Sequence, residues 1–150
     1  MSYARIAFAT LFAVLTLYAP AAAVADIPPE SAAMIEKVNE TRRSSGLPTL
    51  QASEVLTGSA RNHARYMLKH DYFGHLASIQ AAGNFLFLGE TLAWHSGWRP
   101  RVGGTFSRWM NSPPHRAVLL SPTFRFIGTG RARGRLGTRA ATTWVAQLGG

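Results

Sequence analysis

The sequence contains no cysteine. The fold therefore cannot be held by disulfide bonds and must depend on packing alone. The same absence excludes catalysis by a thiolate and excludes thiolate metal ligands, so any metal site must use histidine or carboxylate donors.

Acidic residues are also scarce. The chain has 16 Lys and Arg residues against 7 Asp and Glu, a formal net charge of +9, and all the basic residues except Lys37 and Lys69 are arginine. Such a charge attracts anionic partners, among them phosphate-rich cell-wall polymers and acidic lipid headgroups, although we favour a well-solvated surface over a dedicated site as its explanation. No nucleic-acid-binding motif accompanies the charge, so we expect no nucleic acid partner.

Long apolar runs are missing apart from residues 6–18, which follow Arg5 and precede Ala23-Val24-Ala25. A basic residue, an apolar core and an A-x-A site are typical of a secretory signal peptide. We predict that residues 1–25 are removed and that residues 26–150 form one secreted domain, which we expect to be a monomer. A membrane anchor is the weaker alternative, because the run is shorter than the roughly 20 residues that a span needs.

The remaining pattern predicts helices first and strands last. We expect helices over residues 31–44, 53–69, 105–110 and 113–120, with Ser53 and Ser112 at N-cap positions and loops over residues 79–88 and 94–100. Branched and aromatic residues predict antiparallel strands over residues 126–132 and 142–148. The predicted fold class is α+β, with helices packed on an antiparallel sheet. The expected buried stripes comprise Met34, Val38, Leu56, Ala60, Ala64 and Met67.

Two histidines and a glutamate, each beside a turn-forming residue, are the candidates for chemistry: His75, Glu90 and His115. Two imidazoles and a carboxylate are the minimum set for zinc binding or acid–base catalysis. Each also has a structural interpretation: His75 could satisfy backbone carbonyls, Glu90 could cap a helix or pair with Arg116, and His115 could occupy the first turn of a helix. We expect the remaining histidines to be structural, with His63 packed on its helix and His70 and His95 exposed.

Seven motifs stand in an order that resembles one known family. They are Val38-Asn39 with Arg42, residues 46–50, His63-Ala64 with Met67, Phe73-Gly74-His75, residues 89–93, residues 109–116, and the closing segments 127–130 and 147–149. This order is similar to that of the CAP superfamily (cysteine-rich secretory proteins, antigen 5 and pathogenesis-related proteins). The greatest likeness is to its small bacterial branch, the SCP-like extracellular proteins.

The resemblance implies an α–β–α sandwich and a cleft that in the family holds two histidines and two glutamates. The first histidine corresponds to His75, the first glutamate to Glu90 and the second histidine to His115. The second glutamate is replaced by Ser112, and Thr91 replaces the family's asparagine. The cleft residues expected from the resemblance are therefore His75, Glu90, Ser112 and His115.

The expected function is a secreted binding module for a small apolar or anionic ligand, a weakly held divalent metal or a component of the cell envelope such as wall polymer or lipid. Zinc would be exchangeable, with His75 and His115 as its ligands. Glu90 would act either as a third ligand or by orienting an imidazole from outside the coordination sphere. The alternative is a zinc-dependent hydrolase of extracellular or cell-wall substrates, with Glu90 as general base, although the sequence has no H-E-x-x-H helix or nucleophile elbow.

Overall fold

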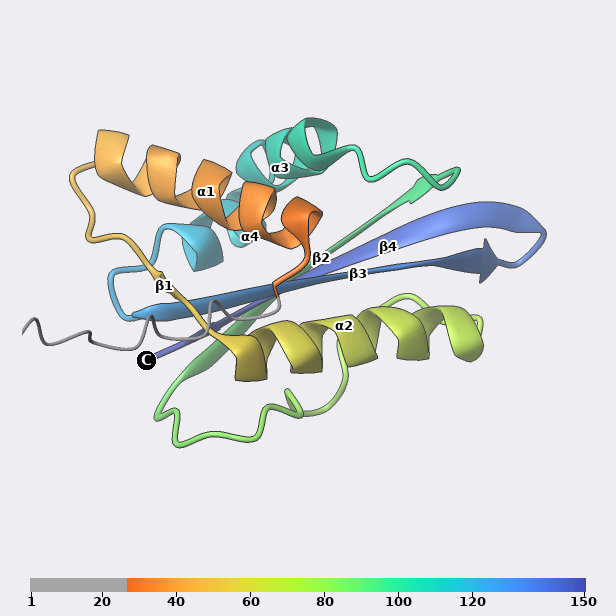
Figure 1. The fold of residues 1–150 in the computed structure, drawn as a ribbon, viewed down its shortest axis with the longest axis horizontal. Helices are drawn as coiled ribbons and strands as arrows, with labels where there is room; N and C mark the ends of the chain where they lie inside the picture. The colour runs from red at the N-terminus through yellow and green to blue at the C-terminus, as the bar shows by residue number, and fades with distance from the viewer. Residues whose placement is uncertain (1–26) are drawn as a thin grey trace, which may run out of the picture.

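The computed structural model describes residues 27–150, so the predicted signal peptide lies outside the described residues. The elements in chain order are α1 (Pro29–Ser44), β1 (Gln51–Ala52), α2 (Glu54–Lys69), β2 (Leu88–Ser96), α3 (Val102–Met110), α4 (Pro113–Leu119), β3 (Phe126–Leu136) and β4 (Arg139–Gly149). Helix α2 covers one face of the sheet, and α1, α3 and α4 cover the other (Figure 1). The predicted α–β–α sandwich is confirmed.

The sheet has the strand order β1-β3-β4-β2. Strands β3 and β4 form a long antiparallel hairpin, and β2 runs antiparallel to β4 along the outer edge. The sheet is mixed rather than purely antiparallel, because the two-residue β1 pairs with β3 in parallel. This arrangement leaves β2 as an edge strand that is accessible to the loop before it and to α4.

Helix α2 lies unusually close to the sheet. The predicted cap is confirmed, since the Ser53 hydroxyl accepts a hydrogen bond from the Leu56 amide at 3.3 Å. The helix rests on two glycines of β3: a Cβ atom at Gly128 would lie 2.1 Å from the Thr57 nitrogen, and one at Gly130 would lie 2.1 Å from the Arg61 nitrogen. Only glycine permits this approach, which brings the side chains of α2 within reach of β4 and β2.

The opposite face carries the larger apolar core. Trp109 and Trp144 are buried there, together with residues from α1 and the strands. Arg42 of α1 is fully buried and donates from Nη1 to the carbonyls of Leu119 and Ser121, each at 2.9 Å. These two bonds hold α1 against the end of α4, the helix that carries His115.

Four expectations about local structure were wrong. The loop expected over residues 94–100 begins later, because residues 88–96 form β2 and pair with β4 from Leu88↔Gly149 to Ser96↔Ala141. The strands of the final hairpin are longer than expected, and α3 begins at Val102 despite its glycines. His95, expected to be exposed, is 7% exposed because it lies within β2. In residues 27–150, no helix has the length and apolar character needed to cross a membrane.

Candidate functional site

The centre of the site is the carboxylate of Glu90 on β2, whose side chain is 5% exposed. Its Oε2 accepts hydrogen bonds from Nδ1 of His63 and from Nε2 of Gln147, both at 2.8 Å. Its Oε1 accepts a hydrogen bond from Nδ1 of His75, also at 2.8 Å. One buried carboxylate therefore accepts hydrogen bonds from side chains of helix α2, of the loop that follows it and of strand β4.

Strand register and helix packing explain this convergence. Glu90 and Gln147 are directly opposite one another on β2 and β4, so their side chains share the face that meets α2. Gly128 is the next residue in the same row, on β3. Because α2 sits directly on that glycine strand, His63 on its buried stripe reaches the carboxylate.

His63 has acceptors on both sides of its ring. Nδ1 faces Glu90, and Nε2 lies 3.1 Å from the carbonyl oxygen of Gly74. A carboxylate and a carbonyl can only accept, so both contacts are hydrogen bonds when both ring nitrogens carry protons. The contact with Glu90 is a buried ion pair whenever the imidazole carries both protons, and the two side chains are 4% and 5% exposed.

Two opposing effects act on the pKa of Glu90. Burial raises it, but hydrogen bonds from His63, Gln147 and His75, together with the charge of His63, outweigh burial and hold the pKa below the ordinary value. Glu90 is thus an ionised carboxylate of reduced basicity.

His75 is the solvent-facing member of the site. Its side chain is 57% exposed, and the Tyr72 hydroxyl donates to its carbonyl at 2.9 Å within the turn that follows α2. His75 and Glu90 line an open groove of about 410 Å³ together with residues 76–79 and 88–89. The ring nitrogen Nε2 is not used in the bond to Glu90, so it is the donor atom available to a metal or ligand.

His115 lies on α4 and is half-buried, and its pKa is lowered by burial and, to a smaller extent, by the charge of His75. It is not among the residues that line the groove of His75 and Glu90. Ser112 stands at the N-cap of α4 without a side-chain capping bond. Across residues 27–150, no three His, Cys, Asp or Glu side chains are grouped closely enough to hold a metal ion.

Sequence reasoning missed two members of the site, His63 and Gln147. His63 was assigned to helix packing, although a buried histidine needs polar partners and its position on the α2 stripe carried that signal. Gln147 is a polar residue in the otherwise apolar last part of β4. Its role could not be inferred because its partner, Glu90, lies on a strand that the local sequence pattern did not predict. An ion pair with Arg116 is one structural interpretation of Glu90 in the sequence. In the structure, Glu90 pairs with His63 and His75 instead.

Comparison with known proteins identifies the domain. A model of the cysteine-rich secretory protein family, CAP, matches residues 35–148. The chain belongs to the CAP family. The CAP domain is 30% identical over 106 residues to the uncharacterized protein YkwD of Bacillus subtilis strain 168, a match that covers 65% of this chain and 40% of YkwD.

Solved structures share the CAP fold. An extracellular protein containing an SCP domain from Bacillus anthracis has a TM-score of 0.65 and 19% identity, covering 80% of this chain and 40% of that one. An outer surface protein from Borrelia burgdorferi has a TM-score of 0.63 and 20% identity, covering 79% of this chain and 90% of that one. The chain thus spans 40% of YkwD and of the B. anthracis protein.

Proposed function

We propose that this CAP domain is a secreted binding module whose cleft, at His75, Glu90 and His115, takes a small apolar or anionic ligand or holds a divalent metal weakly. Export is supported by the signal-peptide pattern of residues 1–25. It is also supported by the extracellular and outer-surface descriptions of the two structural relatives. N-terminal sequencing of the protein recovered from culture medium tests export, with Asp26 as the expected first residue; a form that begins at Met1 and stays with the membrane would contradict it.

The state of Glu90 is the observation that favours binding over catalysis. Three donors occupy its oxygens, and together they lower its pKa. A general base works best when its pKa lies near the working pH and its oxygen can reach a water molecule. A buried carboxylate that already accepts three hydrogen bonds is poorly suited to take a proton.

The residues fit a weak zinc site better than a committed one. His75 offers Nε2 while Glu90 fixes its ring through Nδ1, which is the usual role of a carboxylate behind a metal-binding histidine. His115 supplies a second imidazole, and burial favours its neutral, metal-binding form. Glu90 is turned toward His63 and Gln147, so it supports the ligands rather than joining them, and Zn²⁺ would complete its coordination with water or ligand.

Zinc titration by calorimetry at pH 7.5 tests this proposal. We expect His75→Ala and His115→Ala to abolish measurable binding. Glu90→Gln should weaken binding by about 10–100-fold, the usual cost of losing the group that orients a ligand. His70→Ala is the matched control, since His70 is an exposed histidine at the end of α2 and should leave binding unchanged. Wild-type affinity in the His75→Ala variant would refute the metal site.

The open groove beside Glu90 and His75 keeps zinc-dependent hydrolysis as a second candidate. Hydrolysis would require Glu90 to act as the base despite its lowered pKa. Purified cell wall incubated with the zinc-loaded protein separates the two candidates. Release of soluble fragments that is lost in Glu90→Gln would favour the hydrolase; retention on the wall without release would favour the binding module.

A cell-envelope partner would meet the arginines of the β3–β4 hairpin. Arg131 is half-buried and pairs with Glu30 of α1, so it is not free to bind another anion. Arg133 and Arg135 lie further along the same strand and are exposed, beside the exposed ring of Trp98. We propose that these two arginines, rather than Arg131, hold the domain near anionic wall polymer.

A further inference from the structure

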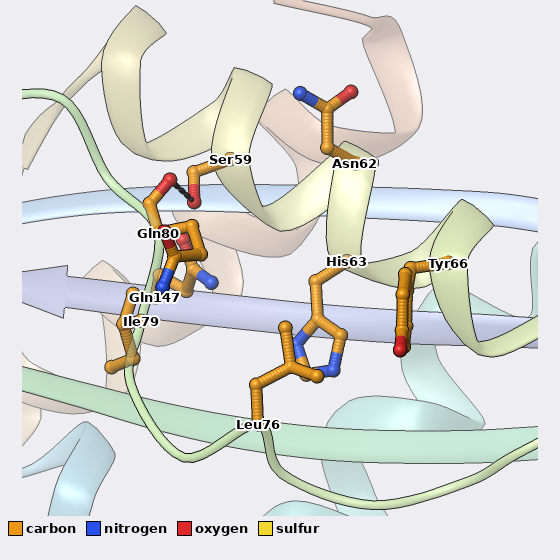
Figure 2. A pocket seen from close by; sticks show the side chains of 8 residues that line it. All are labelled: Ser59, Asn62, His63, Tyr66, Leu76, Ile79, Gln80 and Gln147. Carbon is orange, nitrogen blue, oxygen red and sulfur yellow. Dashed lines mark hydrogen bonds between the residues drawn. The ribbon is translucent and has the colours of Figure 1, made fainter.

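An open groove of about 410 Å³, which we term the hairpin groove, lies where the loop after β2 meets the end of the β3–β4 hairpin. The described residues that line it are Trp98, Arg133, Gly134 and Arg135. The hollow shown in Figure 2, by contrast, shares Leu76 and Ile79 with the groove of the proposed cleft and belongs to that site. The hairpin groove shares no lining residue with either of them, so it is a separate surface.

The two arginines of this groove lie on the face of the sheet that α2 does not cover. A Cβ atom at Gly134 would lie 3.2 Å from the side chain of Leu68, so position 134 faces α2. Because side chains alternate along a strand, Arg133 and Arg135 point to the opposite face. The indole Nε1 of Trp98 donates to the carbonyl oxygen of Gly134 at 3.4 Å. An aromatic ring is thereby held beside two guanidinium groups.

The loop that carries Trp98 is bonded to the sheet on both sides of the ring. The N–H and the carbonyl of Gly97 both bond to β4, the carbonyl to Oγ1 of Thr142 at 2.7 Å. On the other side, the carbonyl of Pro100 accepts a hydrogen bond from Nε1 of Trp144 at 2.8 Å. Trp98 itself is 59% exposed. The groove therefore presents an exposed aromatic ring on a backbone that the sheet holds in place.

The charges of the two arginines are not paired with any described carboxylate. Both side chains are exposed, and neither forms an ion pair within residues 27–150. Arg135 donates to the carbonyl of Thr138, a neutral partner, and the carboxylate of Glu30 is paired with Arg131. A planar guanidinium binds phosphate through two parallel hydrogen bonds. The groove is thus suited to a partner that carries phosphate.

The indole ring restricts the partner further. The face of an aromatic ring is negative, so it attracts the weakly positive C–H groups on the face of a sugar ring. Nucleic acid also combines rings with phosphate, but proteins bind single strands with several aromatic side chains on which successive bases stack. Trp98 is the one aromatic residue among the described residues that line the groove. A single ring beside two arginines favours a sugar phosphate over a nucleic acid strand.

We propose that the hairpin groove binds a phosphate-bearing sugar polymer, with one sugar ring stacked on Trp98 and its phosphates paired with Arg133 and Arg135. This deepens the proposed function and rests on it, since the same two arginines hold the domain near anionic wall polymer. It adds a requirement for the sugar. The groove selects a phosphorylated glycan over a polyanion that offers charge alone.

Three soluble polymers of matched phosphate number separate the sugar from the charge. Phosphorylated dextran carries sugar and phosphate, polyphosphate carries phosphate alone, and oligothymidylate carries phosphate with bases. In binding assays at low salt, we expect Trp98→Ala to weaken binding of phosphorylated dextran about five- to tenfold, as for the loss of one aromatic contact. Binding of polyphosphate should stay unchanged in this variant, which also shows that the variant is folded. Phe87→Ala is the matched control, since Phe87 is 58% exposed and lies outside the groove.

The outcomes distinguish this inference from the proposed function. Unchanged binding of phosphorylated dextran in Trp98→Ala, or an equal loss of dextran and polyphosphate binding, would overturn the stacking on Trp98. Tighter binding of oligothymidylate than of phosphorylated dextran by the wild type would overturn the choice of a sugar polymer. The double variant Arg133→Ser/Arg135→Ser should lose both phosphorylated dextran and polyphosphate. Wild-type binding by the double variant would refute the proposed wall contact itself, whereas a defect in the double variant without one in Trp98→Ala would refute this inference alone.

Discussion

His63 and His75 make the same bond to the same carboxylate, yet we expect them to differ greatly in what they contribute to stability. Each places Nδ1 at 2.8 Å from an oxygen of Glu90, but the His63 side chain is 4% exposed and that of His75 is 57% exposed. Removing one partner of a buried ion pair costs about 3–5 kcal/mol, because the remaining charge stays buried without compensation. The His75 ring of the second pair is open to water, which screens the pair, so we expect it to contribute about 0–1 kcal/mol, as exposed pairs do.

Urea unfolding at pH 7, followed by tryptophan fluorescence, should therefore show a loss of about 3–5 kcal/mol in His63→Ala and of at most about 1 kcal/mol in His75→Ala. His63→Ala also leaves a cavity, so Glu90→Gln and the double variant complete a mutant cycle that isolates the pair. We expect a coupling energy between His63 and Glu90 of about 2 kcal/mol, within the range found for residues in one network.

The pH dependence gives the same reasoning a second test. The pKa of Glu90 in the folded protein is held below its ordinary value of 4.5. The ionised carboxylate therefore makes its full contribution to folding stability above about pH 4.5, and this contribution is lost as the pH falls through the folded-state pKa. Wild-type stability should thus decline on acidification below this pH more steeply than that of Glu90→Gln. Equal destabilisation by His63→Ala and His75→Ala, or a cycle without coupling, would refute the buried ion pair.

Three further predictions concern the fold and the site. Gly130→Ala should lower stability by about 1–3 kcal/mol in the same unfolding assay, since the added Cβ would meet the backbone of α2. The double variant Arg133→Ser/Arg135→Ser should lose most of its retention on anionic wall polymer at low salt, whereas Arg131→Ser should be retained like the wild type. Equal retention of the wild type and both variants would mean that the hairpin arginines only keep this part of the sheet solvated. Zn²⁺ should bind the wild type more tightly at pH 7.5 than at pH 5.5 in calorimetry, because protons compete for imidazole near its reference pKa of about 6.5; equal affinity at both pH values would contradict imidazole ligands.

The helices could be predicted from the sequence because their signals are local. Apolar residues at helical spacing, the Ser53 cap and the proline after Ser112 all act within a few residues. Strand β2 could not, since its conformation is set by pairing with β4, whose residues lie about fifty positions later in the chain. Side chains of β2 such as Trp94 and His95 have no alternating polarity that would reveal this pairing.

The site was predictable only in part, and for a related reason. The resemblance pointed to His75 and Glu90, which the structure places in contact. The partners that decide the charge state of Glu90 come from long-range packing: Gln147 through strand register, and His63 through the close approach of α2 to the glycines of β3. The strand register leaves no mark in the neighbouring sequence, and the place of His63 on the buried stripe of α2 indicates that it needs polar partners without indicating which ones.

The balance of charge in the cleft leads to a final prediction. His63 and Gln147 already occupy Oε2 of Glu90, and Ser112 adds no second carboxylate, so the described cleft residues offer a dication no free carboxylate oxygen on that side. Ser112→Glu should supply one beside His115, and it removes no capping bond, since the Ser112 side chain makes none.

We expect this variant to bind Zn²⁺ at least about tenfold more tightly than the wild type in calorimetry, because zinc sites with an open position commonly use three protein ligands. Ser107→Glu is the control, since it adds the same charge at an exposed position of α3. If the two variants gain equally, the increase reflects the general field of an added anion, and Ser112 does not face the metal. If Ser112→Glu alone gains, the result supports the proposal that the natural cleft holds Zn²⁺ only weakly because it lacks this carboxylate.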